Sequence, residues 1–276
     1  QIVDTNIDQS QRNKPLDLET SETDFLHLGG LGDAFFHQRG MPPSKVAVDL
    51  FHGVARGDFY IFAENPGDEG WARRAIMSRM QSHVSQGMPQ HAPQMMVAQG
   101  LFGSRLLTTA RLNCHASESL KGGIAVITGG ASGIGLAVAH EALGRGLHVA
   151  IGDIEQGALD KAVAELRGAA KAGAGLAVEG YRCDVTDPAS CDAFASSVSS
   201  SASFGGAAVS LLHCNAGVGA GQSALQATPA DWQFTFSVNV FGVANTLRSF
   251  VPAMVRRGAP AAIVTTSSIA GVSSGG

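Results

Sequence analysis

The second half of the sequence alternates short apolar runs with stretches of helical periodicity, and this alternation limits the possible folds more than any other feature. The apolar runs predict strands at residues 124–128, 148–153, 175–185, 209–217 and 261–268. Four segments of helical pattern separate them. Strands joined in this way run parallel, and helices cover both faces of their sheet. We therefore expect an α/β fold, a doubly wound parallel sheet of strand order 3-2-1-4-5.

Two of the predicted helices carry recognisable start signals. Asp187 and Pro188 are typical of an N-cap followed by proline at the first helical position. Thr228 and Asp231 have the spacing of a capping box. We expect the second signal to open one long helix that continues to Arg257.

The first 120 residues follow a different pattern. Residues 1–40 are polar and irregular, 42–57 predict an amphipathic helix, 58–63 a strand and 68–87 another helix. Residues 87–121 are rich in Gln, Pro and Met and predict a connector, with one short helix around 96–107. Because one strand cannot form a sheet, the 58–63 strand must dock on another element, and the exposed edge of the fifth strand is the expected place.

Composition excludes several classes of function. Hydrophobic residues make up 45% and charged residues 15%, as in globular proteins, and the net charge is −4. Without a run of Lys or Arg, neither nucleic acid nor an anionic membrane is an expected partner. The four cysteines show no CxxC spacing and the nine histidines no HExxH motif, so we expect reduced cysteines, a cytoplasmic protein and no metal. The apolar runs are too short to span a membrane.

A glycine-rich turn, TGGASGIG at residues 128–135, connects the first predicted strand to the first helix. Gly129 permits the tight turn, Gly133 lets the backbone approach a pyrophosphate, and Gly135 lets the helix pack closely. The helix N-terminus would face the phosphates. Asp153 ends the second strand, which is the context that turns a weak glycine motif into a dinucleotide-binding prediction of the Rossmann type.

Asp153 also bears on which dinucleotide binds. A carboxylate there accepts hydrogen bonds from the ribose hydroxyls and repels a 2′-phosphate. Positions 130–132 and 154 hold no Arg or Lys to receive such a phosphate. We therefore expect NAD and regard NADP as the weaker alternative. The remaining alternative is that Asp153 only caps a helix and binds no ligand.

Five motifs in order resemble the short-chain dehydrogenase/reductase (SDR) family, in its single-domain branch. They are TGGASGIG, CDVTD at 183–187, CNAG at 214–217, Asn239 within SVNVFG, and VTTSS at 264–268. Cys214 departs from the family's NNAG, a change that we expect to be tolerated. The cofactor-binding residues that the turn and the resemblance imply are Gly129, Ser132, Gly133, Ile134, Gly135, Asp153, Ile154, Asp184, Val185, Asn215, Ala216 and Gly217.

The resemblance implies a catalytic Asn, Ser, Tyr and Lys. Asn239 matches the Asn, which holds a water in the proton relay, and Ser268 matches the Ser, which binds the substrate carbonyl. The family places the Tyr and Lys as YxxxK about thirteen residues after the Ser. This sequence has tyrosine only at Tyr60 and Tyr181, and neither is followed by lysine in that spacing.

Residues 1–90 resemble, more loosely, the C-terminal portion of an SDR unit, with its substrate loop, last helices and last strand. We thus expect residues 91–118 to be a linker and 119–276 to be the head of a second unit, incomplete in its sheet. The first residue, Gln, also suggests part of a longer protein. We expect YxxxK shortly after Gly276 in a parent enzyme, and no hydride transfer by this chain alone.

Three interpretations stay open. In the first, the parent protein is an NAD-dependent oxidoreductase that acts on a small alcohol or carbonyl substrate and forms a homo-oligomer through the helix around Asn239. In the second, the chain is a permuted, catalytically inactive dinucleotide-binding module. In the third, it is a structural or interaction protein. The intact glycine turn and Asp153 argue against the last, because a scaffold has no physical need of them. The substrate itself is not predicted.

Overall fold

The computed structural model describes residues 41–56, 120–171, 175–219 and 225–268. Described residues from Leu120 to Thr266 belong to one compact unit, and Ser267 and Ser268 belong to a second. None of the helices in these ranges has the length and hydrophobicity needed to cross a membrane.

Five parallel strands form the sheet of the first unit, in the order β3-β2-β1-β4-β5. This confirms the predicted α/β class and strand order. Two strands have the predicted bounds, and the other three are shorter than the predicted runs at 175–185, 209–217 and 261–268. Their bounds are β1 (Ile124–Thr128), β2 (His148–Asp153), β3 (Val178–Arg182), β4 (Val209–Cys214) and β5 (Ala262–Thr265).

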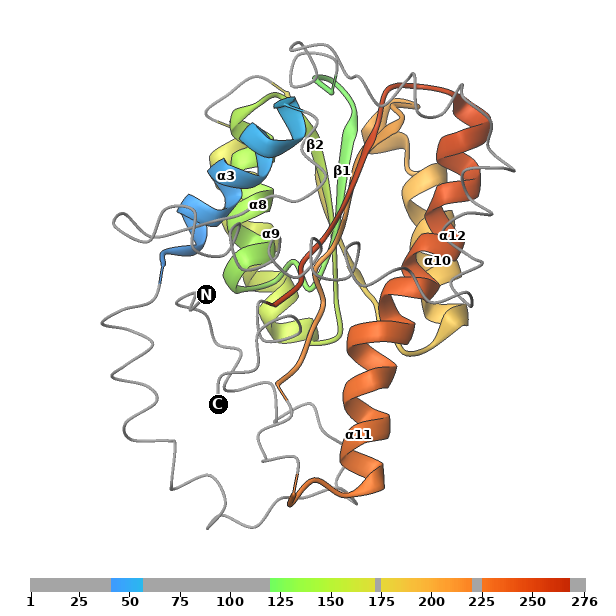
Figure 1. Cartoon of the computed structure of the whole chain (residues 1–276). Coiled ribbons are helices and arrows are strands. Elements are labelled where there is room, and N and C mark those ends of the chain that lie inside the picture. Colours follow the sequence, from blue (N-terminus) through green and yellow to red (C-terminus); the bar gives the residue numbers. More distant parts are fainter. Residues whose placement is uncertain (1–40, 57–119, 172–174, 220–224, 269–276) are drawn as a thin grey trace, which may run out of the picture. The chain divides into compact units, whose positions relative to one another are not determined.

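Helices cover both faces of this sheet, which follows from the right-handed connections between parallel strands. Figure 1 shows α8 and α9 on one face and α10 and α12 on the other. The helices run over α8 (Gly133–Gly144), α9 (Gln156–Lys171), α10 (Pro188–Ser200) and α12 (Gly242–Arg257).

The core is centred on β1, whose five residues are all buried. Between the sheet and the pair α10 and α12, Phe194 meets Phe250 edge to face, with ring centroids 5.2 Å apart. Cys183, Cys191 and Cys214 are buried in this layer as free thiols, as predicted, and burial raises the pKa of Cys214 to about 12. Cys114 lies outside the described residues.

Both predicted start signals are confirmed. The carboxylate of Asp187 accepts a hydrogen bond from the amide of Ala189 at 3.0 Å, and Pro188 opens α10. Thr228 and Asp231 form a reciprocal capping box at the start of α11 (Pro229–Phe236). Each box partner removes an unpaired backbone donor from the helix end.

The long helix predicted to continue to Arg257 is not uniform. Between α11 and α12 it contains a π-helical turn, η4 (Ser237–Phe241). Such a turn widens the helix by one residue and often occurs at functional sites. Asn239, predicted as a site residue, lies in its middle.

The helix predicted at 42–57 is present as α3 (Pro43–Arg56). Its apolar residues Ala47, Leu50, Phe51 and Val54 are buried, together with Met41 before it. The strand predicted at 58–63, the helices predicted at 68–87 and around 96–107, and the expected docking on the fifth strand lie outside the described residues.

Candidate functional site

The glycine turn after β1 is held against both neighbouring strands. Gly129 has φ +63° and Gly133 has φ +53°, a region that glycine adopts without the steric cost of a side chain. A Cβ at Gly129 would lie 2.8 Å from the Cα of Ala216, and one at Gly130 would lie 2.6 Å from the Cβ of Ile151. The turn therefore depends on glycine for its conformation and for its close packing.

The first turn of α8 presses on this glycine turn. A Cβ at Gly135 would lie 2.1 Å from the carbonyl oxygen of Gly129, closer than any side chain could approach. Ser132 occupies the N-cap position but makes no capping hydrogen bond with its side chain. The helix thus presents its N-terminus next to the turn, and such an end favours negative charge.

Asp153, at the end of β2, is joined to the same turn. Its Oδ2 accepts a hydrogen bond from the amide of Ala131 at 3.1 Å, and its Oδ1 accepts one from the amide of Glu155 at 3.1 Å. Ile154, between the two, is half-buried. Ala131 and Asp153, which are 22 positions apart in the sequence, are therefore in direct contact. The backbone amides of Ala131 and Glu155 together orient the Asp153 carboxylate.

Asn215, directly after β4, ties this turn to the centre of the sheet. Its Nδ2 donates to the carbonyls of Thr128 at 3.2 Å and Gly129 at 3.1 Å. The hydroxyl of Thr128, which is buried, accepts from the amides of Asn215 at 3.0 Å and Ala216 at 3.2 Å. Sequence reasoning named Asn215 and Ala216 but not Thr128; the signal was a hydroxyl at the last position of an apolar strand.

A chain of hydrogen bonds continues from Asn215 to β4 and to the exposed Thr266 at the end of β5. The hydroxyl of Thr266 donates to Asn215 Oδ1 at 2.9 Å, and His213 Nε2 lies 2.9 Å from the same hydroxyl oxygen. Since the hydroxyl has only one proton, which Asn215 receives, His213 Nε2 must be the donor in the second bond. His213 is therefore the neutral Nε2–H tautomer.

The imidazole of His213 is fully buried, and its Nδ1 has no hydrogen-bond partner. Removal from water disfavours the charged form, so burial lowers the pKa of His213 to about 4. Sequence reasoning missed this residue. The available signal was a histidine inside the otherwise apolar run VSLLHC.

Asn239, in η4, holds the loop that follows Asn215. Its Oδ1 accepts from the amide of Val218 at 2.9 Å and its Nδ2 donates to the carbonyl of Val218 at 2.9 Å. Gly217 lies in the same loop, where a Cβ would come within 3.4 Å of Asn239 Oδ1. Both polar atoms of the amide group therefore bind the backbone of this loop.

Ser268, the other residue predicted to act in catalysis, is exposed and belongs to the second compact unit. The site described here is therefore built from β1, β2, β3, β4, η4 and the end of β5 at Thr266.

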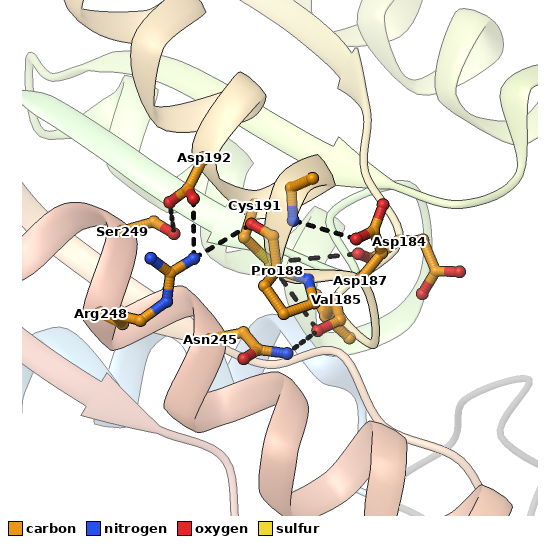
Figure 2. A network of polar contacts seen from close by, with 10 residues as sticks. Asp184, Val185, Asp187, Pro188, Cys191, Asp192, Asn245, Arg248 and Ser249 are labelled. Carbon is orange, nitrogen blue, oxygen red and sulfur yellow. Dashed lines mark hydrogen bonds and ion pairs between the residues drawn. The ribbon is translucent and has the colours of Figure 1, made fainter.

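Asp184 and Val185 lie in the turn between β3 and α10. Asp184 Oδ1 accepts from the amide of Thr186 at 2.9 Å and from its hydroxyl at 2.7 Å. Val185 is buried, and its carbonyl accepts a hydrogen bond from Asn245 Nδ2 at 2.9 Å. Figure 2 shows this turn between α10 and α12, with Asn245 reaching it from α12.

The predicted dinucleotide-binding residues thus meet at the carboxyl edge of one parallel sheet. Four successive βα connections supply them, because the carboxyl ends of parallel strands lie at the same edge. Among the described residues no group of three His, Cys, Asp or Glu side chains is arranged to hold a metal ion.

Comparison with known proteins identifies the family. The family model of the short chain dehydrogenases matches residues 123–276. The C alpha-dehydrogenase of Sphingobium sp. is 35% identical over 148 residues, which are 54% of this chain and 46% of that protein. Galactitol 2-dehydrogenase (L-tagatose-forming) of Cereibacter sphaeroides is 38% identical over 152 residues, 55% of each chain.

A solved structure shows the same fold at higher identity. A short chain dehydrogenase/reductase from Burkholderia phymatum, solved in complex with NAD, is 39% identical with a TM-score of 0.51, covering 56% of this chain and 52% of that one. The chain spans about half the length of the curated relatives it matches. With the sheet order, the glycine turn and the family match in agreement, the chain belongs to the short-chain dehydrogenase family.

Proposed function

We propose that this chain binds a nicotinamide dinucleotide at the carboxyl edge of its sheet. The observation that carries the proposal is the hydrogen bond from Ala131 to Asp153, which joins a phosphate-type glycine turn to a carboxylate of the next strand. The relative from Burkholderia phymatum, described in complex with NAD, supports it.

The residues present fit such a molecule. The N-terminus of α8, where Ser132 makes no side-chain cap, suits the negative charge of a pyrophosphate. Each carboxylate oxygen of Asp153 accepts a backbone hydrogen bond and, having two lone pairs, can also accept one from a ribose hydroxyl. Asp184, Val185, Asn215, Ala216 and Gly217 would line the rest of the molecule.

NAD is the proposed cofactor rather than NADP, because the negative charge of Asp153 would repel a 2′-phosphate. The structure also offers an argument for NADP. Arg182 is the register partner of Asp153 on β3 and is exposed, so a cation stands one strand away. NAD is preferred because the Asp153 carboxylate, and not Arg182, is hydrogen-bonded to the glycine turn through Ala131.

The experiment measures dissociation constants of NAD and NADP by calorimetry. We expect tighter NAD binding by the wild-type chain and a ratio of the two constants that falls about tenfold in Asp153→Asn. Asp160→Asn removes an equal charge from exposed α9 and should leave the ratio unchanged. Equal binding of both dinucleotides by the wild type would contradict the NAD preference, and a ratio shifted by Arg182→Gln alone would assign discrimination to that residue.

For the reaction, we propose hydride transfer between the nicotinamide and a small alcohol or carbonyl compound. Relatives such as the galactitol 2-dehydrogenase of Cereibacter sphaeroides support this class of reaction. The cofactor supplies or accepts the hydride. Ser268 would donate a hydrogen bond to the substrate carbonyl oxygen. Asn239 would order the loop at 215–218 through its two bonds to Val218.

A second candidate is a dinucleotide-binding module without catalysis. The observation that favours it concerns Tyr181, one of the two tyrosines in the sequence. Its hydroxyl donates to Glu179 on β3, and burial, followed by the Glu179 hydrogen bond, raises its pKa above the ordinary value, so it is a poor general acid/base. We expect this chain to bind NAD without oxidising alcohols; turnover of any alcohol, seen as reduced nicotinamide absorbance, would contradict that.

The remaining proposals concern the whole protein. Residues 1–90 are the C-terminal portion of one unit, 91–118 a linker, and 119–276 the nucleotide-binding portion of another. Exposed Trp232, Phe236 and Val240 on α11 and η4 support assembly into a homo-oligomer. The free cysteines support a cytoplasmic location.

A further inference from the structure

The turn that carries Asp184 is held from outside by α12. Asn245 Nδ2 donates to the carbonyl of Val185 at 2.9 Å, and Arg248 Nη2 donates to the carbonyl of Pro188 at 3.1 Å. One helix face thus binds two carbonyls of the segment 184–188. Figure 2 shows both side chains reaching this segment from α12.

The two bonds differ in setting. Asn245 is part-buried and bonds a carbonyl of the buried Val185, whereas Arg248 is exposed and also pairs with Asp192 at 2.8 Å. An exposed ion pair contributes little, because water and salt screen it. Loss of a hydrogen bond to a part-buried carbonyl costs more, since the carbonyl loses a partner that water replaces poorly.

Packing at the same point leaves the turn little freedom. A Cβ at Gly242 would lie 2.6 Å from Cγ2 of Val185, so the first residue of α12 is in close contact with the turn. Within the turn, Asp184 Oδ1 is used by the amide and hydroxyl of Thr186. The Asp184 carboxylate is therefore bound to Thr186, whose backbone directly follows the Val185 carbonyl.

The π-turn η4, which directly precedes α12, contacts the loop after β4. Gly242 directly follows η4, and Asn239 within η4 binds both backbone groups of Val218. One continuous helical segment therefore contacts two loops of the site, the 184–188 turn and the loop at 215–218.

We propose that Asn245 is a positioning residue for the adenine half of the dinucleotide: its hydrogen bond to Val185 fixes the turn that places Asp184 against the adenine end of the site. The inference rests on the proposed dinucleotide binding. It assigns to a residue outside every sequence motif the task of holding one loop of the site in place.

The test separates the two halves of the ligand. The full chain is titrated with NAD, AMP and nicotinamide mononucleotide, each followed by NMR. In Asn245→Ala we expect NAD and AMP to bind about fivefold to tenfold more weakly, with the mononucleotide within about twofold of the wild type. A merely structural loss would weaken both halves alike, so equal weakening, or AMP affinity within about twofold of the wild type, would overturn the proposal.

The matched control is Ser249→Ala. Ser249 lies one turn further along α12 and donates to Asp192 on α10 at 2.7 Å, a partner outside the 184–188 turn. We expect all three affinities to stay at the wild-type level. If the wild type binds neither NAD nor AMP, the proposed function itself fails, an outcome distinct from normal binding by Asn245→Ala.

A measurement on the unaltered chain covers the case in which Asn245→Ala does not fold. With ¹⁵N labelling, AMP should shift the signals of the Asn245 side-chain amide and of the Thr186 backbone amide, while nicotinamide mononucleotide should not. AMP binding that leaves both signals unmoved would overturn the proposal.

Discussion

The side-chain amide of Asn239 forms a two-bond pair with the backbone of Val218, with both N···O distances at 2.9 Å. The side-chain amide of Asn239 thus binds the backbone N–H and C=O of one residue, as a neighbouring strand does in a sheet. The π-turn puts Asn239 where it can do so, and the pair restrains the loop that carries Asn215, Ala216 and Gly217.

Replacing Asn239 should therefore loosen this loop. Asn239→Asp keeps the shape and the acceptor but sets a carboxylate oxygen against the carbonyl of Val218, so we expect a loss of about 1 kcal/mol in the free energy of unfolding. Urea denaturation measures it. A variant as stable as the wild type would show that the pair contributes nothing.

Gly135 and Gly144 lie on the same helix, α8, and make a matched comparison. A Cβ at Gly135 would meet the carbonyl of Gly129 at 2.1 Å, whereas one at Gly144 would meet nothing within 4 Å. We expect Gly135→Ala to destabilise the chain by about 1–3 kcal/mol or more through overpacking. Gly144→Ala should stabilise it by about 0.5–1 kcal/mol, because alanine favours the helix. Thermal unfolding of both variants tests the pair; similar melting temperatures would refute the close contact.

His213 predicts a pH dependence of stability. Its pKa is about 4 in the folded protein and 6.5 in the unfolded chain. Between these values the unfolded state binds more protons, so the contribution is fully present above pH 6.5 and is lost as the pH falls to 4. The loss amounts to about 3 kcal/mol.

The measurement is the difference in unfolding free energy between the wild type and His213→Gln across this pH range, which cancels the carboxylates common to both. His140→Gln serves as the control, since His140 is 36% exposed in its side chain and bonded to Glu165 on the surface. A wild-type curve parallel to that of His213→Gln would show that His213 is not buried as a neutral group.

Thr266 and His213 should behave as a coupled pair. Thr266→Val removes the acceptor for His213 Nε2 and the donor for Asn215 Oδ1, so we expect a loss of about 2 kcal/mol. When His213 is already replaced by Val, Thr266→Val should reduce the free energy of unfolding by less, because the imidazole donor is then absent. A double-mutant cycle in urea measures the coupling; additive losses would mean that the bond between the two side chains contributes nothing.

Much of this architecture could be predicted because its signals are local. The alternation of apolar runs and helical stretches led to the strand order, and Asp187 and Thr228 marked helix starts through bonds that span only two or three residues. Gly129 indicated a tight turn and Gly135 indicated close helix packing, and the structure confirms both. Such features depend on neighbours in the chain, so they can be read without coordinates.

Contacts between distant residues needed the fold. His213 and Thr266 are separated by 53 positions and Asn245 and Val185 by 60, and no spacing rule links them. The parallel sheet brings the ends of its strands to one edge, where η4 contacts the loop after β4 and α12 contacts the turn after β3. The sequence alone determined the order of the strands, the glycine turn and the position of Asp153 at the end of the second strand. Which polar side chains contact one another at that site, including the bond between Ala131 and Asp153, was decided by the packing of helices and strands. A hydrogen bond depends on distance in space and not along the chain.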